Sequence, residues 1–270
     1  MNRYELLDLW DRLGTAPALA KAFGVGLRAR AKSPGLVPGY QAEVQTSHLE
    51  NAAQFPDYYL KSFHGQPNGY LSEESARIYD LGQSLFFFGS DGLVRKTLLR
   101  RLPREASRLL DLGCANGAST FGLARRFPQA ALHAVDLSPF FLARAKERAA
   151  RLRLTDRITF HQENAESMPC FETGSFDLIT STFLHHEVPL SANRRILREA
   201  RRLLSPGGCL AILDELQLSD TEKASWIPAI AYEPHYPDYF KLVWEQELRD
   251  AGFTSVESKT SWVSKTIIAS

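Results

Sequence analysis

The stretch LLDLGCANGAST, residues 109–120, constrains the fold of this 270-residue chain more than any other segment. Its apolar run ends in Asp111, a turn containing Gly113 and Gly117 follows, and residues compatible with a helix come next. Because glycine has no Cβ atom, the backbone can turn tightly there and approach a ligand closely. A strand, a glycine-bearing turn and a helix are the elements with which an open parallel sheet binds a nucleotide-like ligand. The stretch predicts an α/β fold with a ligand site at the tip of its first strand.

The turn does not match the dinucleotide-binding fingerprint G-x-G-x-x-G. Aligned from Gly113, that pattern requires glycine at positions 115 and 118, where the chain has Ala115 and Ala118. Asp111 closes the predicted strand, where a carboxylate can meet a cationic amino group. An ordinary tight turn between a strand and a helix is the alternative interpretation of this stretch.

Strand-like and helix-like segments alternate from about residue 90 onward, as they do in a doubly wound α/β domain. Strands are expected over residues 108–111, 131–136, 158–161, 176–181, 209–213, 255–259 and 264–269. Helices are expected over residues 92–102, 140–152 and 238–252, with one more that Ser191 caps and that ends at residue 204. Before residue 90 this alternation is absent, and helical segments flank a stretch rich in aromatic residues. We therefore predict a helical cap over residues 1–90, which covers a substrate pocket, and a ligand-binding domain over residues 91–270.

Composition argues against several classes of function. The formal net charge of +1 gives no global attraction to nucleic acid, and without a basic stripe we expect no nucleic-acid partner. No run approaches the roughly 18 apolar residues of a membrane span, and the first residues lack the apolar core of a secretion signal. The three cysteines are far apart, without metal-ligand spacing. We expect a cytoplasmic protein with no membrane partner and no bound metal, and we leave a homodimer open.

The pattern D-x-G-x-x-x-G, formed by Asp111, Gly113 and Gly117, resembles motif I of the class I S-adenosylmethionine (SAM)-dependent methyltransferases. In that family a further glycine is usual where this chain has Ala115. Three more segments resemble family motifs in the family's order: QENAESMP at 162–169 resembles D-A-x-x-L-P, SFDLI at 175–179 resembles motif IV, and LLSPGG at 203–208 resembles the L-x-P-G-G turn. The resemblance implies a Rossmann-like seven-stranded sheet and SAM as cofactor, with S-adenosylhomocysteine as product.

The ends of the predicted strands, together with the resemblance, indicate where this cofactor binds. Asp136 follows the second strand, where it can accept hydrogen bonds from a ribose diol, and Leu137 is placed to pack on the base. Asn164, where the family more often has Asp, and Ala165 are expected at the adenine edge. The complete predicted set is Asp111, Gly113, Cys114, Gly117, Asp136, Leu137, Asn164, Ala165 and Ser181. Asp136 alone does not separate SAM from NAD, because an acid at this position also binds the ribose of NAD.

His185, His186 and Glu187 follow the fourth predicted strand, at the switch point of a doubly wound sheet, and are the predicted catalytic residues. Imidazole titrates near neutral pH, so either histidine can take a proton from a phenol, a carboxylic acid or a thiol. We place His186 first because HEVP at 186–189 resembles a segment of some family members, as does EPHY at 233–236. The alternative is that one histidine only closes the loop by hydrogen bonding.

Three tyrosines are predicted to contact the substrate or to face the cationic sulfonium with their rings: Tyr79, Tyr232 and Tyr236. Core packing is the alternative for each of them.

The leading hypothesis is SAM-dependent methylation of a small molecule, at an oxygen atom. The family's amino-methylating signature N/D-P-P-Y/F is absent after the fourth strand, where the chain has STFL at 181–184. An NAD(P)-dependent oxidoreductase and a non-catalytic SAM-binding protein are the alternatives. The sequence does not indicate which acceptor is used.

Overall fold

The computed structural model describes residues 55–61, 68–86, 90–220, 234–261 and 264–270. The helical segments expected before residue 55 and the predicted substrate residue Tyr232 lie outside these ranges. In the described ranges no helix is both long enough and apolar enough to cross a membrane.

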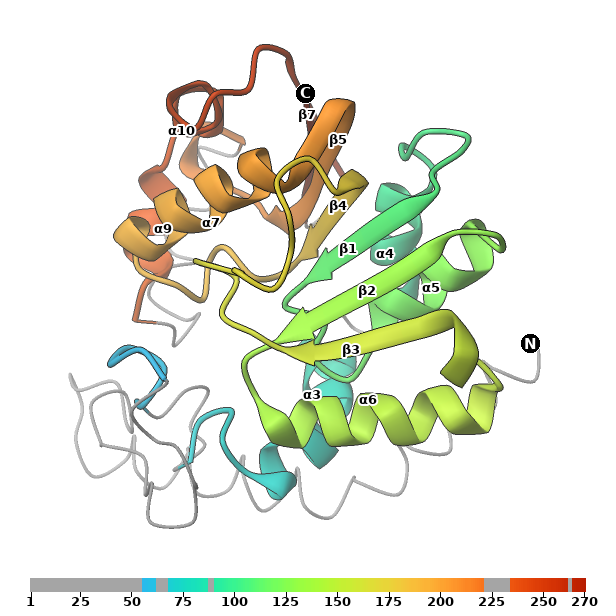
Figure 1. Ribbon diagram of the computed structural model, residues 1–270. Helices are drawn as coiled ribbons and strands as arrows, with labels where there is room; N and C mark the ends of the chain where they lie inside the picture. The colour runs from blue at the N-terminus through green and yellow to red at the C-terminus, as the bar shows by residue number, and fades with distance from the viewer. Residues whose placement is uncertain (1–54, 62–67, 87–89, 221–233, 262–263) are drawn as a thin grey trace, which may run out of the picture.

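The described part of the chain contains one sheet of seven strands, in the order β3-β2-β1-β4-β5-β7-β6 (Figure 1). The strands are β1 (Arg108–Leu112), β2 (Ala131–Asp136), β3 (Ile158–Gln162), β4 (Phe176–Thr182), β5 (Leu204–Glu215), β6 (Val256–Thr260) and β7 (Ser264–Ala269). Strand β7 runs antiparallel to both of its neighbours, whereas the pairs from β3 to β5 are parallel. The predicted seven-stranded α/β sheet is confirmed.

Helices cover both faces of the sheet because alternate strand residues are apolar on both sides. Leu109 and Leu178 pack with α4, α5 and α6, whereas Leu110 and Ile179 pack with α7, α9 and α10. The helices are α3 (Glu73–Phe86), α4 (Asp91–Leu99), α5 (Ala118–Arg126), α6 (Pro139–Leu152), α7 (Leu190–Leu203), α9 (Tyr236–Lys241) and α10 (Trp244–Asp250), with short 3₁₀ turns at Thr155–Arg157 and Leu218–Asp220. Such continuously buried strands are typical of parallel sheets covered on two faces.

The strand order creates a switch point between β1 and β4. The chain proceeds from β1 outward through β2 and β3, then returns to pair β4 with the other edge of β1. Connections on the two sides leave in opposite directions, which opens a crevice at the carboxyl ends of these strands. Residues that follow β1, β2 and β4 therefore meet in one place.

Two element boundaries differ from the predictions in the second half of the domain. Strand β5 begins at Leu204 rather than near residue 209, because Leu204 already pairs with Phe176 across a register shift in β4. A Cβ atom at Gly208 would lie 3.1 Å from the carbonyl oxygens of Phe176 and Asp177, so glycine allows this close pairing. Helix α7 begins after Pro189, whose carbonyl accepts the first helical hydrogen bond from the Asn193 N–H at 3.0 Å, so Ser191 is not its cap.

The single helix predicted over residues 238–252 is two helices, α9 and α10. Leu242 has extended backbone angles of φ −66° and ψ 139°. The buried Gln217 amide donates to the carbonyls of Tyr239 and Leu242, at 3.1 Å and 2.6 Å. Gln217 bonds to the carbonyls at the end of α9 and comes from a segment distant in sequence. The local pattern of residues 238–252 contains no sign of it, and therefore predicted one uninterrupted helix.

Residues 68–86, which belong to the predicted cap, are attached to the sheet domain by buried polar contacts. Asp80 in α3 forms an ion pair with Arg148 in α6, and both side chains are buried. The Asn116 amide donates to the Ala76 carbonyl at 2.7 Å. Helix α3 is therefore anchored on α6, while the division at residue 90 stays a prediction.

We expect Asp80→Ala to lower the free energy of unfolding by about 3 kcal/mol, because it leaves the buried Arg148 guanidinium without its carboxylate. Urea unfolding followed by circular dichroism measures the change. Arg77→Ala, at an exposed position of the same helix, is the matched control. Equal stabilities of the two variants would contradict the anchoring role.

Candidate active site

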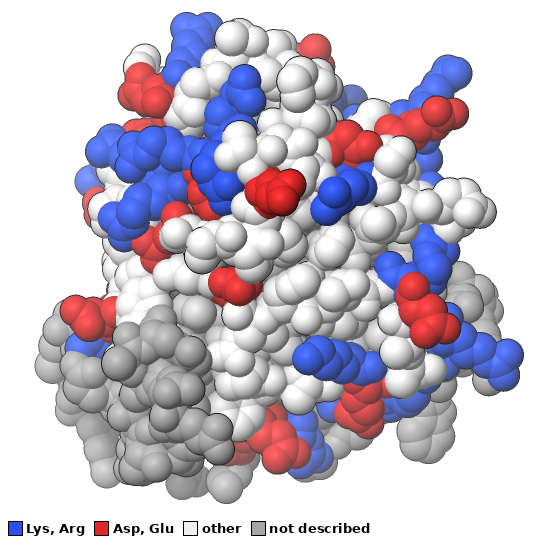
Figure 2. All heavy atoms as spheres, viewed as in Figure 1, with Lys and Arg blue, Asp and Glu red and all other residues white. Residues whose placement is uncertain are grey.

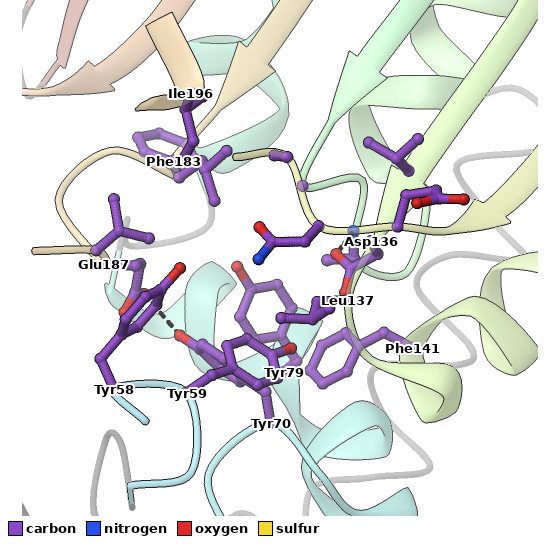
Figure 3. A pocket seen from close by; sticks show the side chains of 18 residues that line it. Tyr58, Tyr59, Tyr70, Tyr79, Asp136, Leu137, Phe141, Phe183, Glu187 and Ile196 are labelled. Atoms are coloured by element: carbon purple, nitrogen blue, oxygen red, sulfur yellow. Dashed lines mark hydrogen bonds between the residues drawn. The ribbon is translucent and has the colours of Figure 1, made fainter. Parts of the chain in front are cut away.

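A cavity of about 760 Å³, its opening to solvent included, lies at the carboxyl ends of β1, β2 and β4 (Figure 3). Its walls come from the glycine turn, the loops after β2, β3 and β4, and the tyrosines of the cap segment. The lining residues are Tyr58, Tyr59, Tyr70, Tyr79, Gly113, Ala115, Val135, Asp136, Leu137, Phe141, Glu163, Asn164, Ala165, Phe183, Leu184, Glu187, Val188 and Ile196. The cavity is thus lined by residues of both the predicted ligand-binding domain and the predicted cap.

The glycine turn has left-handed backbone angles at three positions. Gly113 has φ +63°, and a Cβ atom there would come within 3.1 Å of the Leu184 side chain. Gly117 has φ +84°, and its Cβ atom would lie 2.6 Å from the Phe121 ring. Ala115 has φ +45°, at the position where the family motif usually has glycine. A left-handed conformation costs an L-residue roughly 1–2 kcal/mol, so Ala115 is strained in this turn.

Asp136 fixes the turn from the side of β2. Its carboxylate accepts hydrogen bonds from the backbone N–H groups of Ala115 and Ser138, each at 2.8 Å. Burial raises the pKa of Asp136 to about 6, although these backbone donors act in the opposite direction. Asp136 and Leu137 both line the cavity, as a ribose and base site requires.

Asp111 does not line the cavity. Its two carboxylate oxygens accept hydrogen bonds from the hydroxyls of Thr120, at 2.6 Å, and Thr180, at 2.8 Å. Burial raises the pKa of this carboxyl, and the two threonine hydroxyls partly oppose the shift. In this structure Asp111 links β1 to β4 and α5 rather than facing a ligand amino group.

Three further residues of the predicted cofactor set lie behind the cavity wall. Cys114 is buried in the core next to α4 and α5, Gly117 caps α5, and Ser181 is fully buried within β4. None of the three is part of the lining. They shape the backbone of the site, whereas Gly113, Asn164 and Ala165 are part of its wall.

The loop after β3 is held in place by side chains at the cavity rim. The Asn164 side-chain oxygen accepts a hydrogen bond from the Glu166 N–H at 3.0 Å. Glu166 in turn accepts from the Tyr58 hydroxyl at 2.6 Å and pairs with Arg195. The cap segment and the predicted adenine loop are therefore in direct contact.

His185 points away from the cavity. Its Nδ1 atom lies 2.9 Å from the Asn193 side-chain oxygen, and its ring packs edge-on against Trp244 at a centroid distance of 5.0 Å. The ring is fully buried, and burial lowers its pKa. This geometry gives His185 a packing role and does not support the prediction that it takes a proton from a substrate.

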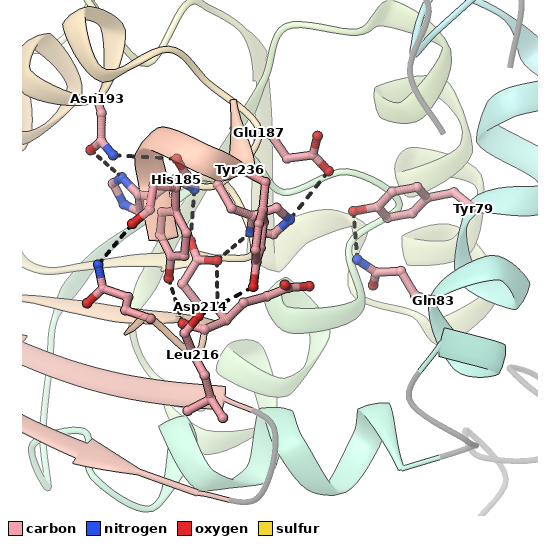
Figure 4. A network of polar contacts seen from close by, with 12 residues as sticks. Tyr79, Gln83, His185, Glu187, Asn193, Asp214, Leu216 and Tyr236 are labelled. Carbon is pink, nitrogen blue, oxygen red and sulfur yellow. Dashed lines mark hydrogen bonds and ion pairs between the residues drawn. The ribbon is translucent and has the colours of Figure 1, made fainter. Parts of the chain in front are cut away.

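His186 belongs to a buried polar chain that ends at the cavity (Figure 4). Its Nδ1 atom forms a short hydrogen bond with Asp214 at the end of β5, and its Nε2 atom lies 3.5 Å from Glu187 Oε1. The same Glu187 oxygen accepts a hydrogen bond from the Tyr70 hydroxyl at 2.6 Å. Glu187 and Tyr70 line the cavity, so a carboxylate, an imidazole and a second carboxylate connect its wall to the core.

The predicted substrate tyrosines have different positions. Tyr79 lines the cavity, with its ring 5.1 Å from that of Phe141 and its hydroxyl accepting from Gln83 at 2.8 Å. Tyr236 is 1% exposed and is not part of the lining; its hydroxyl donates to the Leu216 carbonyl at 3.4 Å. Core packing is the observed role of Tyr236.

Asp214 and the cavity tyrosines Tyr58, Tyr59 and Tyr70 are not among the site residues predicted from the sequence. Asp214 follows an apolar strand, which is the signal that identified Asp136, and the same rule applied to the fifth strand would have found it. The three tyrosines belong to the aromatic stretch of the cap, where no pattern distinguishes cavity residues from core residues. Among the described residues no group of three or more His, Cys, Asp or Glu side chains is arranged to hold a metal ion.

Comparisons with known proteins show which proteins this chain is similar to. A methyltransferase-domain family model matches residues 109–208. Erythromycin 3''-O-methyltransferase of Saccharopolyspora erythraea is 32% identical over 171 residues, which cover 58% of this chain and 53% of that protein. The ubiquinone/menaquinone biosynthesis C-methyltransferase UbiE of Rickettsia akari is 30% identical over 172 residues, which cover 62% of this chain and 67% of that protein.

A solved O-methyltransferase family protein from Burkholderia thailandensis has the same fold, with a TM-score of 0.58 and 20% identity over 74% of this chain and 62% of that one. The aligned part of the chain spans between about half and two thirds of the two curated relatives. With the strand order, the glycine turn and Asp136 at the tip of β2, these similarities show that the chain belongs to the class I SAM-dependent methyltransferases. The family predicted from the motifs is confirmed.

We expect Gly113→Ala to lower the free energy of unfolding by about 1–2 kcal/mol, because alanine is strained at φ +63° and its Cβ atom crowds Leu184. Gly92→Ala is the control: no atom lies within 4 Å of its new Cβ, and alanine favours the helix by up to about 1 kcal/mol. Urea unfolding of both variants checks the prediction, and equal shifts in the same direction would contradict it.

Proposed function

We propose that the protein is a SAM-dependent methyltransferase that methylates an oxygen atom of a small molecule. The observation that carries this proposal is the polar chain from Asp214 through His186 to Glu187, which reaches the wall of a cavity built on the family's cofactor motifs. A hydroxyl acceptor must lose its proton on methylation, and this chain offers a place for that proton.

The residues at the strand tips fit SAM. A Cβ atom at Gly113 would come within 3.1 Å of the Leu184 side chain, so glycine leaves this part of the cavity open. Asp136 presents a carboxylate to the cavity, where it can accept hydrogen bonds from a ribose diol. Leu137, Asn164 and Ala165 continue this wall toward the adenine position. SAM supplies a methyl group on a sulfonium whose thioether is a good leaving group, so alignment and exclusion of water are the main tasks of the protein.

The polar chain determines how a proton is held. Asp214 fixes Nδ1 of His186, which leaves Nε2 directed at Glu187. Glu187 and His186 can therefore share a proton taken from an acceptor at the cavity wall. An amine acceptor needs no such step before it attacks, and this difference favours oxygen over nitrogen. Carbon methylation of an acidic carbon is a second outcome that the acceptor assay below distinguishes.

The lining of the cavity favours a small methyl acceptor. Its acceptor side is formed by the rings of Tyr58, Tyr59, Tyr70 and Tyr79, which suit an aromatic or otherwise apolar molecule with few polar groups. The net charge of +1 offers no attraction for nucleic acid. The missing glycines at Ala115 and Ala118 and the family assignment argue against an NAD(P)-dependent oxidoreductase.

The proposal is tested by the release of S-adenosylhomocysteine with a panel of acceptors. The panel includes hydroxylated sugars and macrolides, phenols and quinols, with amine analogues of the same shape as controls. Product analysis by mass spectrometry and NMR identifies the methylated atom. Tight SAM binding without turnover on any acceptor would support a non-catalytic SAM-binding protein instead.

We expect His186→Ala to lower kcat by about 100- to 10,000-fold, the usual contribution of general acid–base catalysis. The affinity for SAM, measured by calorimetry without acceptor, should stay unchanged because His186 does not line the cavity. His133→Ala is the control, since His133 lies on β2 and bonds to His161 outside the cavity. Equal losses of turnover and SAM affinity would make His186 a structural residue.

We expect the affinity for S-adenosylhomocysteine to rise with pH through about 6 and to level off above it. Burial raises the pKa of Asp136 to about 6, and ribose hydroxyls donate more strongly to its carboxylate than to the protonated acid, so binding is weaker below that pH. Asp136→Asn should lower the affinity at neutral pH by about 5- to 150-fold and remove this pH dependence. Calorimetric titration across the transition is the measurement, and an unchanged pH dependence in the variant would refute the assignment.

A further inference from the structure

The hydroxyl groups of the cavity tyrosines differ in where their protons are directed. Tyr58 donates to Glu166 at 2.6 Å, and Tyr70 donates to Glu187 at 2.6 Å. Carboxylates of the protein therefore hold both of these protons. Tyr79, which also lines the cavity, has no hydrogen bond to a carboxylate in the described part of the chain.

Two neighbouring side chains fix the direction of the hydrogen bond at Tyr79. Arginine has only N–H donors, and Nη2 of Arg95 donates to the Gln83 side-chain oxygen at 2.5 Å. The amide nitrogen of Gln83 is therefore the atom that faces Tyr79, and it donates to the phenol oxygen at 2.8 Å (Figure 4). Nη1 of Arg95 donates to the Ser119 hydroxyl at 2.6 Å, which holds the guanidinium in place. The Tyr79 oxygen is thus an acceptor toward Gln83, and its own proton must point elsewhere.

No described group of the protein receives this proton. Within the described ranges, Gln83 is the one hydrogen-bond partner of the Tyr79 hydroxyl. Burial and the nearby Glu187 carboxylate raise the pKa of Tyr79 above its usual range, so the phenol keeps its proton at neutral pH. Because the side chain lines the cavity, its hydroxyl is a fixed hydrogen-bond donor for a bound ligand.

The Tyr79 hydroxyl lies near the groups to which the proposed function assigns the proton of the methyl acceptor. Glu187 and His186 both act electrostatically on Tyr79, and Figure 4 shows the hydroxyl end of its ring directed to the side where Glu187 lies. The residues expected to bind the nucleoside, Asp136 and Leu137, follow β2 in another part of the cavity wall. This position favours the acceptor over the nucleoside as the partner of the phenol.

The oxygen atom that is methylated is a poor partner for this donor. It passes its proton to Glu187 and must direct an electron pair at the methyl group of SAM. A hydrogen bond from Tyr79 to the same oxygen would stabilise that electron pair and weaken the attack. A second oxygen atom of the acceptor, next to the reacting hydroxyl, can accept from Tyr79 without this effect.

We propose that Tyr79 selects methyl acceptors in which a second oxygen atom neighbours the methylated hydroxyl, as in a vicinal diol, an ortho-diphenol or a hydroxy ketone. This inference rests on the proposed function, because it concerns the acceptor of the same reaction. Gln83 is a positioning residue in this arrangement, since it fixes the direction of the phenol proton and does not itself line the cavity.

The test uses pairs of acceptors that differ at this one atom: ortho-methoxyphenol with ortho-ethylphenol, and a sugar that has a vicinal diol with its deoxy analogue. The readout is the ratio of the two kcat/KM values, from the release of S-adenosylhomocysteine, because a loss of folded protein cancels in this ratio. The wild-type protein should favour the member with the second oxygen by about 5- to 150-fold, the effect of leaving a buried donor unpaired. Tyr79→Phe should bring the ratio close to one and leave the affinity for S-adenosylhomocysteine, measured by calorimetry, unchanged.

Gln83→Glu is the more specific variant, because it keeps the size of the side chain and reverses one hydrogen bond. The new carboxylate pairs with Arg95 and accepts from the Tyr79 hydroxyl, so the proton no longer reaches the ligand. We expect the ratio to fall to that of Tyr79→Phe, although the phenol is still present. Tyr58→Phe is the matched control, since it removes a hydroxyl from the same cavity whose proton Glu166 already holds, and it should keep the wild-type ratio.

A wild-type ratio close to one, or a Gln83→Glu variant that retains the wild-type ratio, would overturn the inference alone. A Tyr79→Phe variant that binds S-adenosylhomocysteine more weakly would do the same, because the phenol would then contact the cofactor. A wild-type protein that turns over no acceptor of any class would overturn the proposed function as well.

Discussion

The buried carboxylate of Asp111 is the interaction on which the site depends. It accepts hydroxyl hydrogen bonds from Thr180 in β4 and Thr120 in α5, and so it joins the two strands that part at the switch point to the helix that follows the glycine turn. A buried carboxylate is costly unless its oxygens are satisfied, and here each oxygen has a donor from a different element. The position of the glycine turn relative to β4 follows from this arrangement, and with it the distance across the cavity between Asp136 and Glu187.

A second buried carboxylate organises the loop after β4. Asp214 at the end of β5 bonds to the Nδ1 atom of His186 and to the backbone N–H groups of His185 and Glu215. One side chain therefore fixes both the path of the loop after β4 and the orientation of an imidazole. The two carboxylates belong to strands on either side of β4, so the parallel core of the sheet determines the spacing of the two walls of the cavity.

The sheet and the position of the cavity could be predicted because they follow from local patterns: apolar runs that end in Asp111 and Asp136, and glycines where the backbone must turn. The different positions of His185 and His186 could not be predicted, because two neighbours in a loop can point to opposite sides. Only their partners, Asn193 in α7 and Asp214 in β5, decide which of them faces the site. The break between α9 and α10 has the same origin, since the side chain that causes it, Gln217, comes from another segment. Motif I alone suggested a direct ligand contact for Asp111, but motifs do not reveal how a buried acid divides its hydrogen bonds between ligand and scaffold.

Tyr70 connects two walls of the cavity, one through its side chain and the other through its backbone. It donates to Glu187 Oε1, while the backbone carbonyl of the same residue accepts from Ser138, the N-cap of α6 beside Asp136. One residue of the cap segment therefore bonds both to Glu187 on one wall of the cavity and to the loop that carries Asp136 on another.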